Sequence, residues 1–323
     1  MRAVDVIEPG GPEQLTVTDL PDPVAGPGDL LVRVVAAGVN RADLLQRQGY
    51  YPPPAGISNV IGLEVAGRVE AVGSSVEGWA VGDEVVALLA GGGYAELAVV
   101  PAGQCCRPPQ GVDLVTAAAL LEVAATVVSN LSRVGFVDGE SFLVHGGTGG
   151  IGAFAIQYVK ARGGLVLTTA GSAEKLEQCR ALGADVAIDY HEDWAAAVNQ
   201  ATSGRGVDVL LDVMGAKYLE ANVASLARNG RLVVIGLQGG RKGTLDLNAL
   251  LTKNALVTAS SLRFSPVERK CEIVAMVARE VWPMYEAGRI ELPTVRAFAL
   301  DDVRAAHEWL GSGAASGKAV LVV

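Results

Sequence analysis

Hydrophobic and polar residues follow different patterns in three successive parts of the chain. Residues 1 to about 120 contain short apolar runs separated by Gly and Pro, which is typical of β-strands joined by tight turns. The clearest predicted strands are 30–37, 64–72, 84–88 and 94–100, and one short helix is predicted over 41–47. The first part of the chain is therefore predicted to be rich in β-structure.

Residues from about 121 to 265 alternate apolar, strand-like runs with helical periodicity. The predicted strands are 141–145, 165–170, 186–189, 207–213, 231–236 and 256–260, and the predicted helices are 151–162, 173–182, 193–203 and 217–226. This alternation is typical of a parallel sheet covered by helices on both faces. It predicts an α/β domain of the doubly wound class.

The last part of the chain returns to a mixed pattern. It predicts a helix over 266–287, a strand over 295–300, a short helix that Asp301 caps and that runs to Leu310, and a final strand over 319–323. We expect this tail to pack on the first domain. The predicted domains are therefore 1–120 with 266–323, and 121–265.

Composition narrows the classes of protein that fit. Half of the 323 residues are hydrophobic and 19% are charged, which excludes a disordered chain. The net charge of −9 argues against nucleic-acid or membrane partners. The apolar stretch 114–128 contains Glu122 and is too short to span a bilayer. No two of the four cysteines have the C-x-x-C spacing of a zinc ribbon or a redox motif, so we expect a reducing, cytoplasmic location.

The sharpest motif is a G-x-G-x-x-G pattern that follows the strand 141–145 and opens the next helix. Glycines let the backbone approach a pyrophosphate, and the helix N-terminus offers free N–H groups to the anion. This context predicts a dinucleotide site rather than a simple tight turn. The predicted contacts in this loop are Gly147, Thr148, Gly149, Gly150, Ile151 and Gly152.

The choice of nucleotide depends on the residues after the second predicted strand of this domain. NAD sites usually carry Asp or Glu there, to bind the ribose 2′-hydroxyl. This chain has Gly171 and Ser172 instead, with Lys175 following, and Tyr190 closes the next strand. A hydroxyl and an ammonium suit a 2′-phosphate. NADPH is therefore predicted as the cofactor. The alternatives are that Lys175 is only a solvated side chain of the helix and that Tyr190 is only a half-buried aromatic residue.

Several motifs together resemble the quinone oxidoreductase (zeta-crystallin-like) branch of the medium-chain dehydrogenase/reductase superfamily. They are Asn40-Arg41-Ala42-Asp43-Leu44, Gly62-Leu63-Glu64-Val65-Ala66-Gly67, Gly82-Asp83, the glycine loop, and Gly171-Ser172-Ala173-Glu174-Lys175. The run 40–49 looks most similar to the tumour-suppressor-inducible quinone oxidoreductases. The resemblance implies a GroES-like first domain, a six-stranded Rossmann domain and a homodimer joined through Rossmann sheet edges.

The resemblance also bears on metals, because zinc-using relatives carry Gly-His-Glu where this chain has Gly62-Leu63-Glu64. Leucine cannot ligate zinc, the cysteine expected before the short helix is absent, and the three histidines are scattered. We therefore expect no metal site. Glu64, a ligand in relatives, is expected to serve structure here.

Without zinc, the substrate must supply its own electrophilicity, as quinones and enones do. By resemblance, the cleft lies between the domains, with Asn40 and Tyr51 facing the nicotinamide and Thr126 near its ribose or carboxamide. Tyr51 is predicted to donate a hydrogen bond or a proton to the developing oxyanion, or only to stack as a wall. Asn40 could instead cap the following helix.

The remaining predicted cofactor contacts follow later strands or match the family. They are Gly236, Leu237, Leu262, Arg263 and Lys318. Lys318 could equally be an exposed surface residue. The sequence favours an NADPH-dependent quinone oxidoreductase, and it leaves open an enal or enone reductase and an NADPH-binding protein with little turnover.

Overall fold

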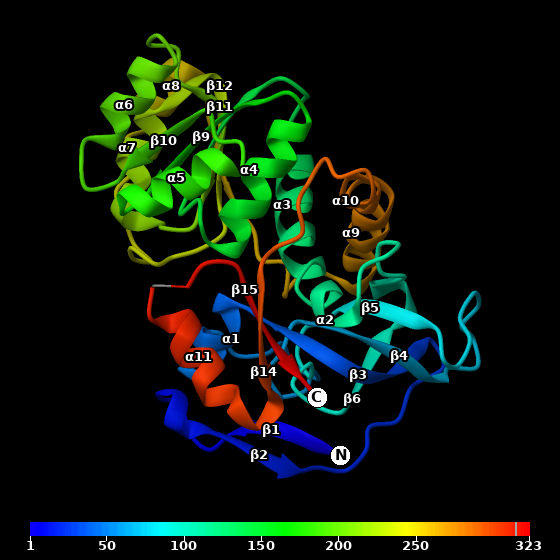
Figure 1. The fold of residues 1–323 in the computed structure, drawn as a ribbon. Helices are drawn as coiled ribbons and strands as arrows, with labels where there is room; N and C mark the ends of the chain where they lie inside the picture. Colours follow the sequence, from blue (N-terminus) through cyan, green and yellow to red (C-terminus); the bar gives the residue numbers. More distant parts are fainter. Residues whose placement is uncertain (314) are drawn as a thin grey trace. The chain divides into compact units, whose positions relative to one another are not determined.

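The computed structural model describes residues 1–313 and 315–323 and divides the chain into two units, which are drawn in Figure 1. Unit 1 consists of Met1–Ala125 and Leu262–Val323, and unit 2 consists of Thr126–Ser261. The domain limits given above, with breaks at 120/121 and 265/266, stay a prediction. Each unit is described by itself.

Unit 2 is built on a sheet of six parallel strands. The strands are β8 (Ser141–His145), β9 (Leu165–Ala170), β10 (Val186–Asp189), β11 (Val207–Asp212), β12 (Leu226–Val234) and β13 (Leu256–Ala259). Their order across the sheet is β10-β9-β8-β11-β12-β13. This is the strand order of Rossmann folds, so the predicted six-stranded Rossmann sheet is confirmed.

The helices of unit 2 connect successive strands of this sheet. They are α4 (Gly150–Ala161), α5 (Ala173–Ala181), α6 (Trp194–Ala201), the one-turn η3 (Ala216–Tyr218), α7 (Leu219–Ala224) and α8 (Leu247–Lys253). Right-handed crossovers place α4 and α5 on one face and α6, α7 and α8 on the other (Figure 1). The sheet presents fully buried Leu143, Leu167, Leu210 and Leu232 to the core.

Unit 1 contains a two-stranded and a seven-stranded sheet. The strands are β1 (Arg2–Val6), β2 (Leu15–Asp19), β3 (Asp29–Val39), β4 (Glu64–Val72), β5 (Glu84–Leu88), β6 (Leu97–Pro101), β7 (Cys105–Cys106), β14 (Val295–Ala299) and β15 (Lys318–Val322). The larger sheet has the order β14-β15-β3-β4-β5-β7, with β6 also paired to β3. The C-terminal strand β15 therefore completes a sheet that begins near the N-terminus.

Short helices surround the sheets of unit 1. They are η1 (Pro12–Gln14), α1 (Arg41–Arg47), η2 (Ala102–Gln104), α2 (Leu114–Ala117), α9 (Val267–Glu280), α10 (Trp282–Glu286), η4 (Leu300–Asp302) and α11 (Val303–Gly311). Helix α3 (Leu121–Arg133) begins in unit 1 and ends in unit 2. The core gathers residues from both ends of the chain, including Val32, Ala87 and Leu321.

Two sequence-based predictions in the C-terminal part are wrong. The helix expected over 266–287 is interrupted after α9, because Pro283 has no amide hydrogen to continue the helical bonding. Asp301 does not cap the next helix. Its carboxylate accepts a hydrogen bond from Arg2 Nη2 at 2.5 Å, and α11 follows Asp302, which makes no side-chain cap bond.

Three predicted element limits also differ from the structure. The strand expected over 94–100 begins only at Leu97, because the carbonyl of Tyr94 accepts from Val4 N (2.9 Å) and Ala95 bridges to Ala3. The strand expected over 231–236 is β12, which begins at Leu226. The helix expected over 217–226 is divided into η3 and α7.

Among the described residues, one helical stretch is long and apolar enough to cross a membrane by length and composition. It is Leu114–Arg133, with a mean hydropathy of 1.8, and it comprises α2 and α3. Within this stretch 78% of the most apolar window is buried inside the protein.

Candidate active site

The loop between β8 and α4 carries the predicted glycine motif, and two of its glycines stand where no side chain fits. A Cβ on Gly147 would collide with the Thr168 hydroxyl and lie 2.5 Å from Cys179 Sγ. A Cβ on Gly152 would lie 2.7 Å from the Cα atom of Gly147. Gly146 turns the chain with a φ of 77°, in the left-handed region. The loop is therefore a close-packed backbone turn.

The N-terminus of α4 opens directly from this turn. Gly149 is the N-cap, and the first helical hydrogen bond runs from Ala153 N to its carbonyl at 2.8 Å. The amides of the first three helix residues, beginning with Gly150 and Ile151, lie before that bond and point out of the helix end. Together with Thr148 in the turn, they form the cradle that a pyrophosphate requires.

A second group of predicted residues follows the end of β9. Gly171 packs against Tyr190, because a Cβ on Gly171 would collide with the Tyr190 hydroxyl. Ser172 is the N-cap of α5, and its Oγ accepts from the Lys175 amide at 3.3 Å. Ser172 and Tyr190 are exposed, and Lys175 is half-buried. The structure thus brings Tyr190 against Gly171 at the tip of β9, with Ser172 next to Gly171 in the chain and Lys175 in the first turn of α5.

The carboxylate nearest to Tyr190 is engaged with its own loop. Asp189 ends β10, and its Oδ1 accepts from His191 N at 2.9 Å and contacts His191 Nδ1 at 2.7 Å. These hydrogen bonds hold the pKa of Asp189 below its usual value. Asp189 was not among the predicted site residues, because it stands on the third strand of the domain rather than the second.

The loops after β11 and β12 meet the same edge of the sheet, because both strands are parallel to β8. Gly236 packs against the carbonyl of Val213, which a Cβ would approach to 2.7 Å, and Leu237 is half exposed. Asp212, which the sequence analysis missed, is fully buried and accepts from the amides of Met214 (2.7 Å) and Gly215 (2.8 Å). The sequence feature that could have identified Asp212 is a carboxylate at the end of an otherwise apolar strand.

Thr126 lies on α3 and is connected to this edge through Asn130. The Thr126 carbonyl accepts from Asn130 Nδ2 at 2.7 Å, and Asn130 Oδ1 accepts from Ser260 Oγ at 2.6 Å. Ser260 directly follows β13. The Thr126 carbonyl is therefore linked through Asn130 to the carboxyl end of the last strand, and the contact of Thr126 with the cofactor stays a prediction.

In unit 1, Asn40 and Lys318 come together inside the protein. The Lys318 ammonium donates to Asn40 Oδ1 (2.5 Å) and to Glu64 Oε1 (2.9 Å), and Asn40 Nδ2 also donates to Glu64 Oε1 (2.9 Å). Glu64 Oε2 accepts from the Glu122 amide at 2.9 Å. Lys318 is only 4% exposed, so the alternative of a surface lysine is wrong.

A second buried polar group adjoins this one through Asn40. The backbone N–H of Asn40 donates to Asp43 Oδ2 (2.7 Å), which also accepts from the Tyr94 hydroxyl (3.0 Å). Tyr94 lies 3.4 Å from His307 Nε2, and Arg47 Nη1 lies 3.2 Å from His307 Nδ1. Burial raises the pKa of Asp43 to about 7 and lowers the pKa of His307 to about 3. None of Asp43, Tyr94, Arg47 and His307 was among the predicted site residues.

Tyr51 and Arg263, which were predicted separately, contact each other in the structure. Arg263 Nη1 donates to the Tyr51 carbonyl at 2.8 Å, and its guanidinium carbon lies 5.1 Å from the centroid of the Tyr51 ring. Phe264 packs edge-on against the same ring at 5.5 Å. Arg263 is 3% exposed, and burial lowers the pKa of its guanidinium. Leu262 is half-buried next to it.

The potential metal-ligating side chains do not gather into a metal site in the part of the chain that the structure describes. No group of three or more His, Cys, Asp or Glu side chains is arranged to hold a metal ion there. Leu63 is buried beside Glu64, and both carboxylate oxygens of Glu64 already accept hydrogen bonds.

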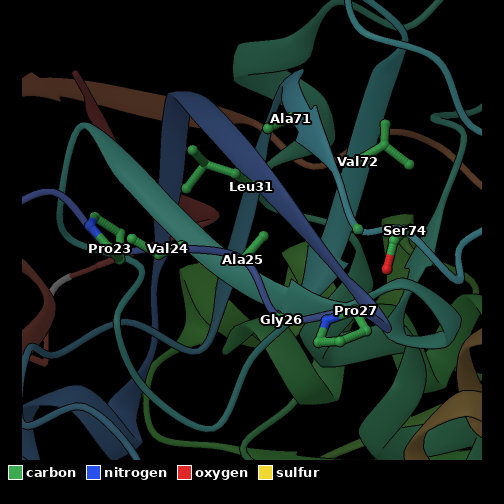
Figure 2. Close-up of a pocket in the computed structure, with 10 residues that line it drawn as sticks. Pro23, Val24, Ala25, Gly26, Pro27, Leu31, Ala71, Val72 and Ser74 are labelled. Carbon is green, nitrogen blue, oxygen red and sulfur yellow. The ribbon is translucent and has the colours of Figure 1, made fainter.

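Figure 2 shows a surface depression of unit 1, between the segment 23–27 and the strands β3 and β4. None of its ten lining residues is titratable: Pro23, Val24, Ala25, Gly26, Pro27, Leu31, Ala71, Val72, Gly73 and Ser74. It therefore has no acid–base or nucleophilic chemistry beyond one hydroxyl. The candidate functional residues are those of the unit 2 loops and, separately, those of the unit 1 pairs described above.

Two family models match the chain. The alcohol dehydrogenase GroES-like domain matches residues 26–110, and the zinc-binding dehydrogenase family matches residues 150–278. A GroES-like domain joined to a Rossmann domain defines the class of medium-chain dehydrogenases and reductases.

Individual relatives narrow this class. The quinone oxidoreductase of Pseudomonas aeruginosa is 35% identical over 317 residues, which is 97% of each chain. The structure of Escherichia coli quinone oxidoreductase complexed with NADPH superposes with a TM-score of 0.89 at 30% identity, over all of both chains. A mycobacterial protein complexed with NADPH gives 0.89 at 35% identity, also over all of both chains.

The chain belongs to the quinone oxidoreductase branch of the medium-chain dehydrogenase/reductase superfamily, and it is an oxidoreductase. The resemblance inferred from the sequence motifs is thereby confirmed at the level of the branch.

Proposed function

We propose that this chain is an NADPH-dependent quinone oxidoreductase that works without a metal ion. The observation that carries the proposal is the pairing of the glycine cradle at α4 with the group Ser172, Lys175 and Tyr190 at the tip of β9. Sequence relatives named as quinone oxidoreductases, and solved relatives complexed with NADPH, support it.

The residues present fit the cofactor. Gly147 and Gly152 stand in places that a Cβ would fill, and the free amides at the α4 mouth suit a diphosphate. Ser172 and Lys175 supply a hydroxyl and a cation for the 2′-phosphate, and β9 ends without a carboxylate that would repel it. When bound, NADPH supplies a hydride that turns a quinone into a hydroquinone monoanion, which then needs one proton.

A metal-free reaction follows from the donor chemistry around Glu64. Leu63 has no ligand atom, and Glu64 shares its oxygens with Lys318, Asn40 and the Glu122 amide. A carboxylate that is held by a buried ammonium is a poor ligand for zinc. The substrate must therefore be electrophilic by itself, as a quinone is.

Tyr51 and Asn40 are the proposed catalytic residues. Tyr51 would donate a hydrogen bond or a proton to the oxygen that becomes negative during reduction. Asn40 keeps one amide hydrogen after its bond to Glu64, and Lys318 fixes which way its amide faces. The same amide group thus serves structure and remains available to a ligand.

We also propose a homodimer formed through the edge of the unit 2 sheet. Strand β13 is the last strand of that sheet, and its side carries exposed leucines on β13 and on α8: Leu247, Leu251 and Leu256. An unpaired edge with exposed apolar side chains favours pairing with a second copy. The cytoplasmic location stays a prediction.

The function is tested by steady-state oxidation of NADPH with a panel of quinones and enones. We expect turnover with ortho- or para-quinones and a lower kcat for Tyr51→Phe with unchanged binding of NADPH. Faster turnover with enals or enones than with any quinone would favour an alkenal reductase. Tight binding of NADPH without oxidation by either panel would refute an enzymatic role.

A further inference from the structure

The segment that carries Tyr51 makes few hydrogen bonds of its own. Three consecutive prolines follow Tyr51 and have no amide hydrogen to donate. Most residues from Ala55 to Asn59 are exposed, and the backbone bonds within the segment are limited to Ile57 N with the Pro54 carbonyl at 3.1 Å. Its geometry must therefore be set by neighbours.

One buried side chain holds the beginning of this segment. Arg263 directs Nη1 to the Tyr51 carbonyl (2.8 Å), Nη2 to Gln46 Oε1 (2.7 Å) and Nε to the Ala90 carbonyl (2.6 Å). The three acceptors come from the Tyr51 segment, from α1 and from the loop that follows β5. A planar guanidinium can donate to three fixed acceptors in this way, whereas the donors of a lysine ammonium all lie on one nitrogen atom.

The same side chain holds the end of the segment through Gln46. The Gln46 amide accepts from Arg263 with its oxygen and donates Nε2 to the Asn59 carbonyl at 2.8 Å. Arg263 and Gln46 thus connect residues 51 and 59, the two ends of the segment, to each other. We call this pair of side chains the Arg263–Gln46 clamp.

The clamp also fixes the ring of Tyr51. The guanidinium carbon lies 5.1 Å from the ring centroid on one side, and Phe264 contacts the ring edge. Arg263 makes no ion pair with any carboxylate among residues 1–313 and 315–323. Its positive charge therefore lies behind the Tyr51 ring without a direct ion-pair partner among those residues, where it favours a substrate that becomes negative on reduction.

We propose that Arg263 is a positioning residue, which acts on the substrate through Tyr51 rather than by binding the cofactor. The proposal rests on the proposed function for its effect on turnover, but the clamp itself can be tested without activity. It replaces the cofactor contact that the sequence suggested for Arg263.

The first experiment is hydrogen exchange on the cofactor-free protein. In Arg263→Met we expect the hydrogen-bonded amides in and beside the segment, Ile57 N (to the Pro54 carbonyl) and Tyr50 N (to the Leu45 carbonyl), to exchange at least tenfold faster, a measurable local opening. The strands of unit 2 should be unaffected. Arg269→Met is the matched control, because Arg269 lies nearby with an exposed partner, Glu272. Unchanged exchange at Ile57, or an equal rise throughout unit 1, would overturn the clamp.

The second experiment separates positioning from cofactor binding. We expect Arg263→Met to lower kcat with a quinone by roughly 10- to 100-fold, since small misplacements of catalytic groups have effects of this size. The Kd for NADPH should stay within about twofold, which is below 0.5 kcal/mol. Combined with Tyr51→Phe, the double variant should be no slower than Arg263→Met. A weakened NADPH Kd with normal kcat, or additive losses, would overturn the proposal.

Two outcomes are kept distinct by this design. If the unaltered protein fails to oxidise NADPH with any quinone, the proposed function fails, and the exchange data still decide the clamp. If Arg263→Met does not fold, Arg263→Lys takes its place. That variant keeps the charge but cannot reach all three acceptors, so it should show the same local exchange, and unchanged exchange in it would refute the clamp.

Discussion

Replacing Lys318 by Met should destabilise unit 1 strongly. The change removes the ammonium and leaves the Glu64 carboxylate, which is 1% exposed, without its counter-charge. Removing one partner of a buried pair typically costs about 3–5 kcal/mol. Glu64 would keep its bonds from Asn40 Nδ2 and the Glu122 amide, both at 2.9 Å, so we expect a loss near the lower end, about 3 kcal/mol.

Urea unfolding followed by tryptophan fluorescence measures this loss. Trp79, Trp282 and Trp309 belong to unit 1 and only Trp194 to unit 2, so the signal reports mainly on the unit that carries the change. Arg33→Met is the control.

That control removes an exposed pair with Glu70 and should cost at most about 1 kcal/mol. The double change Glu64→Gln with Lys318→Met should recover part of the loss, because no unpaired charge remains. Our reasoning fails if Lys318→Met costs no more than Arg33→Met, or if the double change is worse than the single one.

Three further predictions concern the cofactor cradle and the buried carboxylate. Lys175→Ala should raise the KM for NADPH by roughly tenfold or more while leaving the KM for NADH nearly unchanged, since a charge-assisted bond contributes about 1.5–3 kcal/mol; equal losses with both would contradict the 2′-phosphate site. Gly152→Val should abolish NADPH binding in calorimetry while the urea transition of unit 1 persists, because the side chain fills the turn; retained binding would refute the cradle. The pKa of Asp43 is about 7 in the folded protein and 3.8 in an unfolded chain, so the folded protein binds this proton more tightly. The contribution of the protonated carboxyl to stability is therefore present below pH 4 and is lost as the pH rises to about 7. Asp43→Asn should remove that loss and gain up to about 4 kcal/mol on the unaltered protein between pH 4 and 8, and a pH-independent difference in urea unfolding would rule this out.

The sequence predicted the parts of the site that are local in the chain. The glycine turn, its strand and its helix lie within about twenty residues, and spacing alone indicates their geometry. Ser172 and Lys175 are likewise separated by a single helical turn. The alternation of strands and helices predicted the parallel sheet, because in each βα unit the hydrophobic pattern changes from that of a strand to that of a helix.

The parts that escaped prediction depend on contacts between distant residues. Lys318 meets Asn40 across 278 positions and Arg263 meets Tyr51 across 212, and no local pattern encodes such pairs. Lys318 was predicted as a cofactor contact or an exposed residue, and the pairing of β15 with β3 carries it instead into the buried group with Asn40 and Glu64. The likeness to tumour-suppressor-inducible relatives stays a prediction.

The central claim is that the α4 cradle holds a dinucleotide and that the residues around Gly171 select the phosphorylated form. Calorimetric titration of the folded protein with NADPH and, separately, with NADH tests it most directly. The account predicts saturable binding of NADPH that is at least tenfold tighter than that of NADH, a difference of about 1.4 kcal/mol. Equal affinity for the two coenzymes, or no heat with either, would contradict it.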